Sequence, residues 1–280
     1  MNTYHRQKVL RLVQTTVLMT GMVFLAARAA AIVVGPFFGW LLVFVAPIIT
    51  VYSLAGQRLL LPTGTRVLHP AEAPEVYRIL RRLVERAGLD RVPPIYLLPS
   101  SNAEALTTGI GKGTRILLSR GIFHTLSLRE TQAVLAHEVS HIRNHDLPLF
   151  AMAGAMQRLT RLFGVFLTVL VILFFPLILA GIPVIPLRAL LYMTAAPVVT
   201  ALVQFALLRT REFQADLGAA ELTGDPEGLA SALARLESFR RPVWNFFVVN
   251  GSRRTALGEL LRTHPGTEER IARLRELSSA

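Results

Sequence analysis

The chain contains no cysteine. This absence excludes disulfide bonds, thiolate metal sites and cysteine nucleophiles, so any bound metal must take histidine, aspartate or glutamate as ligands. Acidic residues are also scarce, with 18 Asp and Glu against 30 Lys and Arg, which gives a formal net charge of +12. A basic chain can bind nucleic acid, but that requires a clustered patch in a recognisable binding module, and the sequence contains neither. We therefore expect no nucleic-acid partner.

What the chain has in excess is apolar residues, which make up 52% of it and give a mean hydropathy of +0.47. They gather in four stretches, as in membrane proteins. The first two, about Leu12–Val34 and Phe37–Leu54, are separated by a Gly-Pro turn signal, and the other two are Leu162–Leu187 and Ala189–Leu208. Each of the last two is long enough to cross about 30 Å of hydrocarbon at roughly 1.5 Å per residue. The sequence predicts four transmembrane helices, with three as the alternative.

The order of these runs divides the chain into two membrane hairpins, at residues 1–56 and 162–208, and two larger segments, at residues 57–161 and 209–280. An even number of spans leaves both termini and both larger segments on one side. The arginines that flank the apolar runs lie mostly on that side. Positive charge collects on the cytoplasmic flanks of membrane helices. We therefore expect a multi-pass protein of the cell membrane whose larger segments and termini are cytoplasmic.

The two larger segments carry the patterns of helices around a small sheet. Residues 74–87 have an amphipathic helical pattern that Gly88 ends, and Ser127-Leu-Arg-Glu130 is a capping box that begins a helix running through His145. Two further helices are predicted after Asp225-Pro226 and from about Thr267. The sequence also predicts two short strands, separated by an irregular loop at 100–113: Pro94–Leu98 and Arg115–Ser119.

The motif His137-Glu-Val-Ser-His141 lies within the helix that the capping box begins. Histidines at positions i and i+4 of a helix face the same way, so both imidazoles can bind one Zn²⁺. Glu138 lies next to the first histidine and can act as general base on a metal-bound water. Random placement of these residue types predicts only about 0.01 occurrences of the pattern in this chain. The motif therefore predicts one catalytic zinc ion.

A catalytic zinc needs a third protein ligand and an open position. His145 continues the i, i+4 series, but three ligands along one straight helix spread over about 12 Å, too far for one ion. Glu212 is the better candidate, and Asp216 follows one turn later on the same face of its helix. From there Asp216 could accept the outer N–H of a ligating histidine and fix its tautomer. We predict His137, His141 and Glu212 as the ligands.

These motifs and their order resemble the HtpX heat-shock membrane proteases, relatives of the CAAX prenyl endopeptidases within the gluzincin group. The resemblance covers nearly the whole chain. It implies an α-helical membrane protein whose zincin-like, mainly α catalytic domain contains a small sheet and is built from residues 57–161 and 209–280. It also implies peptide-bond hydrolysis with zinc and the clearance of misfolded or damaged membrane proteins under stress. Asp216 then supports the ligands, and Arg270 falls at the family's usual arginine.

His264 and Asn102 are candidate contacts to the substrate or the transition state. An oxyanion donor is expected in addition to the zinc, and His264 is a candidate because Thr263-His264-Pro265 matches the family's His-Pro signature; a structural helix start is the alternative. Asn102 begins the run Asn-Ala-Glu-Ala-Leu-Thr-Thr-Gly, where the family often has Asn-Ala-Phe-Ala-Thr-Gly. Glu104 and two extra residues change this loop, so substrate preference does not carry over from the family.

The expected partners are the lipid bilayer and polypeptide substrates that are unfolded or belong to membrane proteins. The fourth apolar run ends at Leu208, four residues before Glu212, so the metal is expected close to the headgroups. Substrates are expected to bind as extended strands beside an edge strand at Arg115–Ser119. Two other functions are the processing of prenylated proteins, which uses the same residues, and a membrane scaffold without catalysis. The sequence carries no signal for an oligomeric state.

Overall fold

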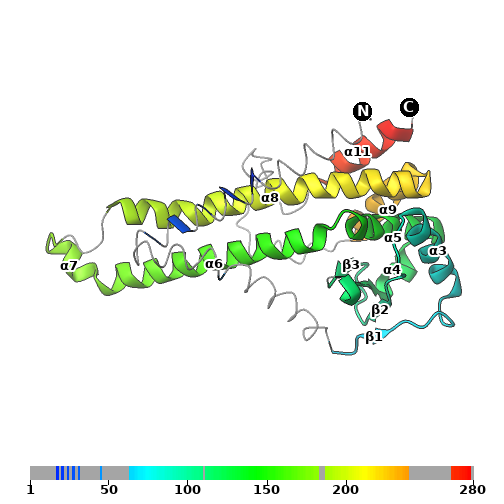
Figure 1. Cartoon of the computed structure of the whole chain (residues 1–280), viewed down its shortest axis with the longest axis horizontal. Coiled ribbons are helices and arrows are strands. Elements are labelled where there is room, and N and C mark those ends of the chain that lie inside the picture. The colour runs from blue at the N-terminus through cyan, green and yellow to red at the C-terminus, as the bar shows by residue number, and fades with distance from the viewer. Residues whose placement is uncertain are drawn as a thin grey trace. The chain divides into compact units, whose positions relative to one another are not determined.

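The structure is a computed structural model (Figure 1). It describes residues 63–109, 111–182, 187–239 and 266–278, together with a few isolated positions before residue 46. The chain divides into two compact units, each built from two separate stretches of sequence. The first comprises Met1–Ser53 with Phe150–Leu207, and the second comprises Leu54–Leu149 with Leu208–Ala280. The division into four segments at residues 56, 161 and 208 remains a prediction.

The described part of the first unit contains most of one long helix and the first part of another, joined through a short one. α6 spans Asp146–Leu173, α7 spans Phe175–Leu179 and α8 spans Leu187–Thr223. The start of α6, up to Leu149, and the end of α8, from Leu208, belong to the second unit. Within this unit α6 and α8 run side by side in opposite directions (Figure 1). The apolar run 162–187 is not one continuous helix, because α6 ends within it and Gly181 takes a φ of 76° before α8 begins.

Many large apolar side chains of the first unit are exposed. Examples are Leu162, Val165, Val169, Ile172, Leu173, Leu191, Val198 and Leu202. Among the described residues, no helix combines the length and the apolar character needed to cross a membrane. The first two predicted spans, at 12–34 and 37–54, fall outside the described residues apart from isolated positions. The four membrane spans therefore remain predictions.

The second unit contains a four-stranded sheet in the order β1-β2-β4-β3. Its strands are β1 (Arg66–Val67), β2 (Ile95–Leu98), β3 (Ala105–Thr108) and β4 (Arg115–Ser119). β2 and β4 are parallel, whereas β1 and β3 each pair antiparallel with their neighbour. All five residues of β4 are buried, as expected for an internal strand covered on both faces.

The strand β3 lies within the segment 100–113, which we expected to be an irregular loop. That prediction was wrong, because four residues within this segment pair antiparallel with β4. β4 consequently has a neighbour on each side. The expectation that Arg115–Ser119 is an edge strand was therefore also wrong, and β3 is the outer strand on this side of the sheet.

Among the described residues, the second unit has five further helices around this sheet. They are α3 (Pro74–Arg86), α4 (Arg120–Thr125), α5 (Leu128–Arg143), α9 (Pro226–Phe239) and α11 (Thr267–Ser278). Their apolar faces form one core with the sheet, in which Leu80, Ile95, Leu118, Leu135 and Leu229 are almost completely buried. Gly88 takes a φ of 66° two residues after α3, which confirms the predicted end of that helix.

The helix α5 begins with the predicted capping box. The Ser127 hydroxyl accepts from the Glu130 backbone N–H, while the Glu130 carboxylate accepts from the Ser127 N–H at 2.8 Å. Glu130 also accepts from Ser231 at 2.6 Å, which ties the start of α5 to α9. The far end differs from our prediction. α5 stops at Arg143, and His145 takes a φ of 55°, so the helix does not run through His145.

A glycine allows α8 to approach α5 closely in the second unit. A Cβ atom on Gly218 would lie 2.0 Å from the Ser140 hydroxyl oxygen and 3.0 Å from its Cβ. A larger residue at Gly218 would displace the Ser140 side chain or move one of the two helices. The segment of α8 that carries Glu212 and Asp216 is therefore held against the helix that carries the two motif histidines.

Candidate metal centre

The helix α5 holds the motif residues in a buried position. His137, Glu138 and His141 each expose less than a tenth of their surface, and every residue from Ala133 to His141 is buried. Polar side chains in such surroundings are stable only when each has a partner. The contacts of these three residues therefore define what the site can bind.

Glu212 reaches this part of α5 from α8. The Nε2 atoms of His137 and His141 are 3.2 Å apart, and the two Glu212 oxygens lie 3.6 Å from the first Nε2 and 3.8 Å from the second. Two ligand atoms about 2.1 Å from a tetrahedral ion are about 3.4 Å apart. One ligand atom from each residue lies within 4.8 Å of the other two. This spacing fits a single tetrahedral metal ion.

The outer nitrogens of both histidines face carboxylates. His141 Nδ1 lies 2.9 Å from Asp146, and His137 Nδ1 lies 3.0 Å from Asp216, although the second contact is poorly aligned for a hydrogen bond. The Asp146 carboxylate accepts from His141 Nδ1, which leaves the lone pair of His141 Nε2 for another partner. His137 Nε2 lies 3.2 Å from that atom, and the Glu212 carboxylate faces both. A cation placed among these three ligand atoms would be attracted by each of them, so the donor set fits a metal.

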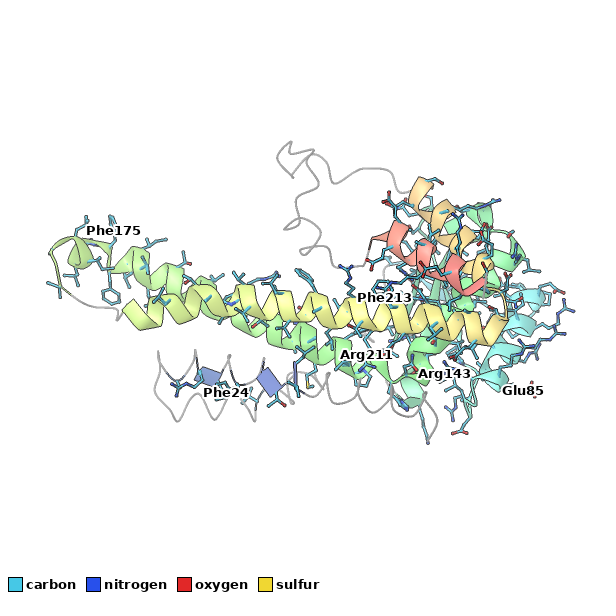
Figure 2. The ribbon with its side chains drawn as sticks, turned by 90° about the horizontal axis from the view of Figure 1, so that it is seen from above. Phe24, Glu85, Arg143, Phe175, Arg211 and Phe213 are labelled. Carbon is cyan, nitrogen blue, oxygen red and sulfur yellow. The ribbon has the colours of Figure 1, made fainter. Side chains whose placement is uncertain are left out.

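Each supporting carboxylate is paired with an arginine. Arg270 on α11 donates to both oxygens of Asp216 at 2.6 and 2.7 Å, and its third nitrogen lies 3.1 Å from Glu212. Arg211, on α8 (Figure 2), lies 3.1 Å from Asp146. Buried carboxylates need such pairing because desolvation alone costs several kcal/mol per charge. We call these groups the His137 network (His137, Asp216, Arg270) and the His141 network (His141, Asp146, Arg211).

The contacts of the site shift pKa values in the direction that favours positive charge at its centre. Burial by itself lowers the pKa of His141, but the hydrogen bond that its Nδ1 donates to Asp146 and the charges of Glu138 and Glu212 raise it above its usual value. Burial raises the pKa of Asp216, and its imidazole and guanidinium partners outweigh burial and lower that pKa. Surroundings that stabilise a protonated imidazole also stabilise a divalent cation at the same place.

Glu138 contacts the outer strand of the sheet. The Thr107 hydroxyl on β3 donates to Glu138 Oε2 at 2.6 Å. A carboxylate has about four acceptor positions, so this bond leaves room for a water molecule on the same group. The hydrogen bond places the candidate general base beside β3.

The other two predicted contacts to the substrate are not brought to the metal centre by any described interaction. His264 lies outside the described residues. The Asn102 side chain is exposed, and its backbone N–H donates to Ser100 Oγ at 3.2 Å. A role for either residue remains a prediction.

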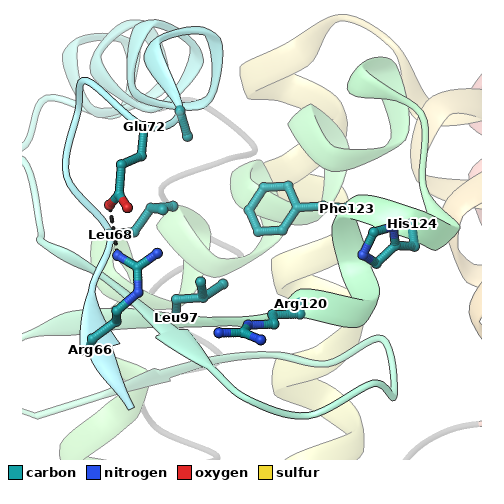
Figure 3. A pocket seen from close by; sticks show the side chains of 8 residues that line it. Arg66, Leu68, Glu72, Leu97, Arg120, Phe123 and His124 are labelled. Atoms are coloured by element: carbon teal, nitrogen blue, oxygen red, sulfur yellow. Dashed lines mark hydrogen bonds and ion pairs between the residues drawn. The ribbon is translucent and has the colours of Figure 1, made fainter. Parts of the chain in front are cut away.

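A separate pocket lies on the second unit (Figure 3). It is lined by Arg66, Leu68, Glu72, Ala73, Leu97, Arg120, Phe123 and His124. Arg66 pairs with Glu72 at 2.8 Å across one side of it. None of the predicted site residues lines this pocket, so it is distinct from the metal centre.

Sequence reasoning missed Asp146 and Thr107. Asp146 is five residues after His141, off the i, i+4 face of the helix, and reaches the imidazole only because the chain turns at His145. Its one signal is an acidic residue immediately before the apolar sequence of α6. Thr107 had no signal, because the strand that positions it was not predicted. Arg270 was noted only through the family resemblance.

The fold and the donor set define a metal-dependent hydrolase, and a comparison with protein families identifies which one. Residues 70–278 match the model described as Peptidase family M48. The chain belongs to this family, and the protein is a metalloprotease.

Two similar relatives carry the same designation. The chain is 31% identical to a Protease HtpX homolog of Burkholderia thailandensis, over 92% of this chain and 96% of that protein. It is 32% identical to a Protease HtpX homolog of Bifidobacterium longum, over 81% of this chain and 78% of that protein. The resemblance to the HtpX proteases that the motifs indicated is thereby confirmed.

A solved structure shares the fold. The crystal structure of Ste24p from S. mikatae superposes with a TM-score of 0.54 at 20% sequence identity, over 97% of this chain. The chain spans 65% of the length of that protein. The match confirms the mainly helical fold with a small sheet.

Proposed function

We propose that this metalloprotease is a zinc-dependent endopeptidase, with His137, His141 and Glu212 as ligands and Glu138 as general base. The observation that carries the proposal is the convergence of the three ligand atoms, with the Nε2 atoms of the two histidines 3.2 Å apart. Two histidines and a glutamate, with one position left for water, are a ligand set of catalytic zinc. The cysteine-free sequence leaves only such ligands available.

The residues of the site have separate tasks in peptide hydrolysis. Bound zinc supplies a Lewis acid and lowers the pKa of a water ligand toward about 7. Glu138 accepts the proton of the attacking water at its carboxylate and delivers a proton to the leaving amine. Thr107 holds Glu138 in place through the 2.6 Å hydrogen bond. Asp216 faces the Nδ1 of His137 at 3.0 Å and orients the imidazole, so that Nε2 can bind the metal.

Metal analysis of the purified full-length protein tests the zinc assignment. We expect close to one zinc per chain, loss of peptidase activity when a chelator removes it, and recovery when zinc is added back. A preparation that keeps full activity without metal would contradict the proposal.

The substrate is proposed to lie along β3. An extended peptide can add to the outer strand of a sheet through main-chain hydrogen bonds. β3 is the outer strand on its side, and Thr107 within it contacts Glu138, so a peptide paired with β3 runs past the base. A photo-crosslinking residue in place of Leu106, which is 58% exposed on β3, should capture a bound substrate peptide. The same residue at Val67 on β1 is the control, and equal capture at both positions would contradict the placement.

We also propose that the protein is a multi-pass membrane enzyme with four spans. The support is the apolar sequence, together with the exposed apolar side chains of the first unit, because an apolar surface of this kind needs lipid or another apolar partner. The arginine asymmetry favours cytoplasmic termini. Reporter fusions after Gln57, near Pro186 and at Ala280 test this topology. A cytoplasmic signal near Pro186, or an external one at Ala280, would overturn it.

The proposed substrates are misfolded or damaged membrane proteins, cut in cytoplasmic loops or in unfolded segments next to the membrane. In the sequence, Glu212 follows only four residues after the apolar run that ends at Leu208, which favours a metal close to the headgroups. The test is to map cleavage sites in model membrane proteins and to compare the rate with that on a prenylated peptide. Cuts mostly far from any span would contradict the placement, and a preference for the prenylated peptide would favour prenyl-protein processing.

A further inference from the structure

The proposed function assigns no role to Asp146, a buried carboxylate next to the metal centre. Its side chain is completely buried, and it is the first residue of α6, immediately after the turn in which His145 takes a φ of 55°. That turn directs the carboxylate back toward the end of α5. A completely buried aspartate is rare and stable only when its charge is matched by partners. The geometry around it indicates what it does.

Each oxygen of Asp146 has its own partner. Oδ2 accepts from His141 Nδ1 at 2.9 Å, and Oδ1 accepts from Arg211 Nη1 at 3.1 Å. Arg211 precedes the ligand Glu212 in α8, whereas His141 is in α5. The carboxylate therefore links a ligand of one helix to the residue beside a ligand of the other.

We infer that Asp146 is a positioning residue for the metal, and that Arg211 holds its carboxylate in place. The inference rests on the proposed metal site and adds a support that no motif predicts. Because the Asp146 carboxylate accepts from His141 Nδ1, it orients the imidazole and leaves the Nε2 lone pair directed at the metal. It also makes the imidazole a better electron donor, which strengthens its bond to a cation.

The alternative is a purely structural role, in which the ion pair only fastens the start of α6 to α8. The two roles differ in one consequence. A structural pair matters because each charge neutralises the other, so removing both charges together relieves most of the penalty of removing one. A positioning carboxylate is needed for His141 itself, so removing Arg211 as well does not restore what Asp146 supplied.

The test compares zinc affinity in three full-length proteins: wild type, Asp146→Asn and the double variant Asp146→Asn with Arg211→Gln. Affinity is measured by competition with a chelator, and the melting temperature of the metal-free protein is recorded beside it. We expect Asp146→Asn to weaken zinc binding roughly 10–100-fold. The double variant should regain melting temperature, because no buried charge is left unpaired, yet keep the weakened affinity. If Asp146→Asn alone folds poorly, the zinc affinity of the double variant still decides between the two roles.

A matched control is the double variant Arg143→Gln with Glu221→Gln. This pair also joins α5 to α8, at 3.1 Å, and neither partner contacts a ligand. It should keep wild-type zinc affinity. Recovery of wild-type affinity in the Asp146 and Arg211 double variant, or an unchanged affinity in Asp146→Asn, would overturn the inference. A wild-type protein that binds no zinc would instead overturn the proposed function, so the two failures are distinguishable.

Discussion

His137 and His141 lie one turn apart on α5, yet the networks behind them are built differently. Behind His137, the carboxylate is held by two hydrogen bonds from an arginine that lies 54 residues further along the chain, but its contact with the imidazole is poorly aligned. Behind His141, the carboxylate is only five residues away, has one arginine contact and forms a well-aligned hydrogen bond. One histidine therefore depends on the docking of α11 and the other on a local turn.

Because the two networks use different helices, they should respond to different changes in the protein. Loss of α11 removes Arg270 and leaves Asp216 and Glu212 as buried charges without their guanidinium. The His141 network contains no residue of α11, so it should survive such a change. A change at the interface between α5 and α8 should instead affect both networks.

The largest effect is expected from Arg270→Gln. Removing one partner of a buried ion pair costs about 3–5 kcal/mol of unfolding free energy, because the other charge stays buried. Chemical denaturation of the metal-free protein measures it. Arg275→Gln, on the same helix with an exposed side chain 3.6 Å from Glu227, is the matched control and should change little. Equal stability of the two variants would show that Arg270 is not needed to neutralise Asp216.

A smaller effect, shared by both networks, is expected from Gly218→Ala. The new Cβ meets Ser140 Oγ at 2.0 Å and Ser140 Cβ at 3.0 Å, so the Ser140 hydroxyl must turn away or α5 and α8 must shift, at a cost of about 1–3 kcal/mol. Zinc affinity should fall together with the melting temperature. Gly164→Ala is the control, because a Cβ there has only ordinary contacts, the nearest being Pro197 Cγ at 3.5 Å. If Gly218→Ala were as stable as wild type, α5 and α8 would have room for a methyl group at this crossing, which would contradict the prediction.

Within the His137 network alone, Asp216→Asn should weaken zinc binding without abolishing it. The expected loss is roughly 10–100-fold, because the neutral amide no longer fixes the proton on His137 Nδ1. The poor alignment of that contact predicts a loss no larger than the one for Asp146→Asn. Chelator competition measures both variants. An unchanged affinity would show that Asp216 serves only local packing.

The smallest effect is expected at Thr107, outside both networks. Thr107→Val removes the hydrogen bond to Glu138, which is worth about 0.5–1.5 kcal/mol, or up to about tenfold in kcat. Zinc content should not change, and Thr107→Ser, which keeps the hydroxyl, should restore activity. Steady-state kinetics with a peptide substrate measures all three proteins. A defect that Thr107→Ser shares in full would assign it to packing instead of the hydrogen bond.

The parts of the site that could be predicted from sequence are those set by local geometry. The i, i+4 spacing of His137 and His141 and the capping box of α5 depend only on the helix that contains them, and the structure has both. The spacing of Glu212 and Asp216 has the same basis. Nothing beyond the period of a helix is needed to place such side chains on one face.

The parts that could not be predicted depend on the path of the chain between elements. Asp146 reaches His141 only because of one left-handed residue, His145, whose conformation no motif encodes. The strand β3 has four residues, and its pairing exists only once β4 lies beside it. A loop pattern and a short outer strand look alike in sequence, because the stabilising contacts come from the partner. Arg270 contacts Asp216 only because α11 packs beside α8, and no local sequence pattern encodes that packing.

The central claim is that Glu138 acts on the water while Glu212 holds the metal. The most direct test is metal analysis and peptidase activity of two purified variants, Glu138→Gln and Glu212→Ala. We expect Glu138→Gln to retain about one zinc per chain and to lose hydrolysis by about 10²–10⁴-fold. Glu212→Ala should lose the zinc as well as the activity. Full zinc occupancy in Glu212→Ala, or near-normal hydrolysis by Glu138→Gln, would contradict this account.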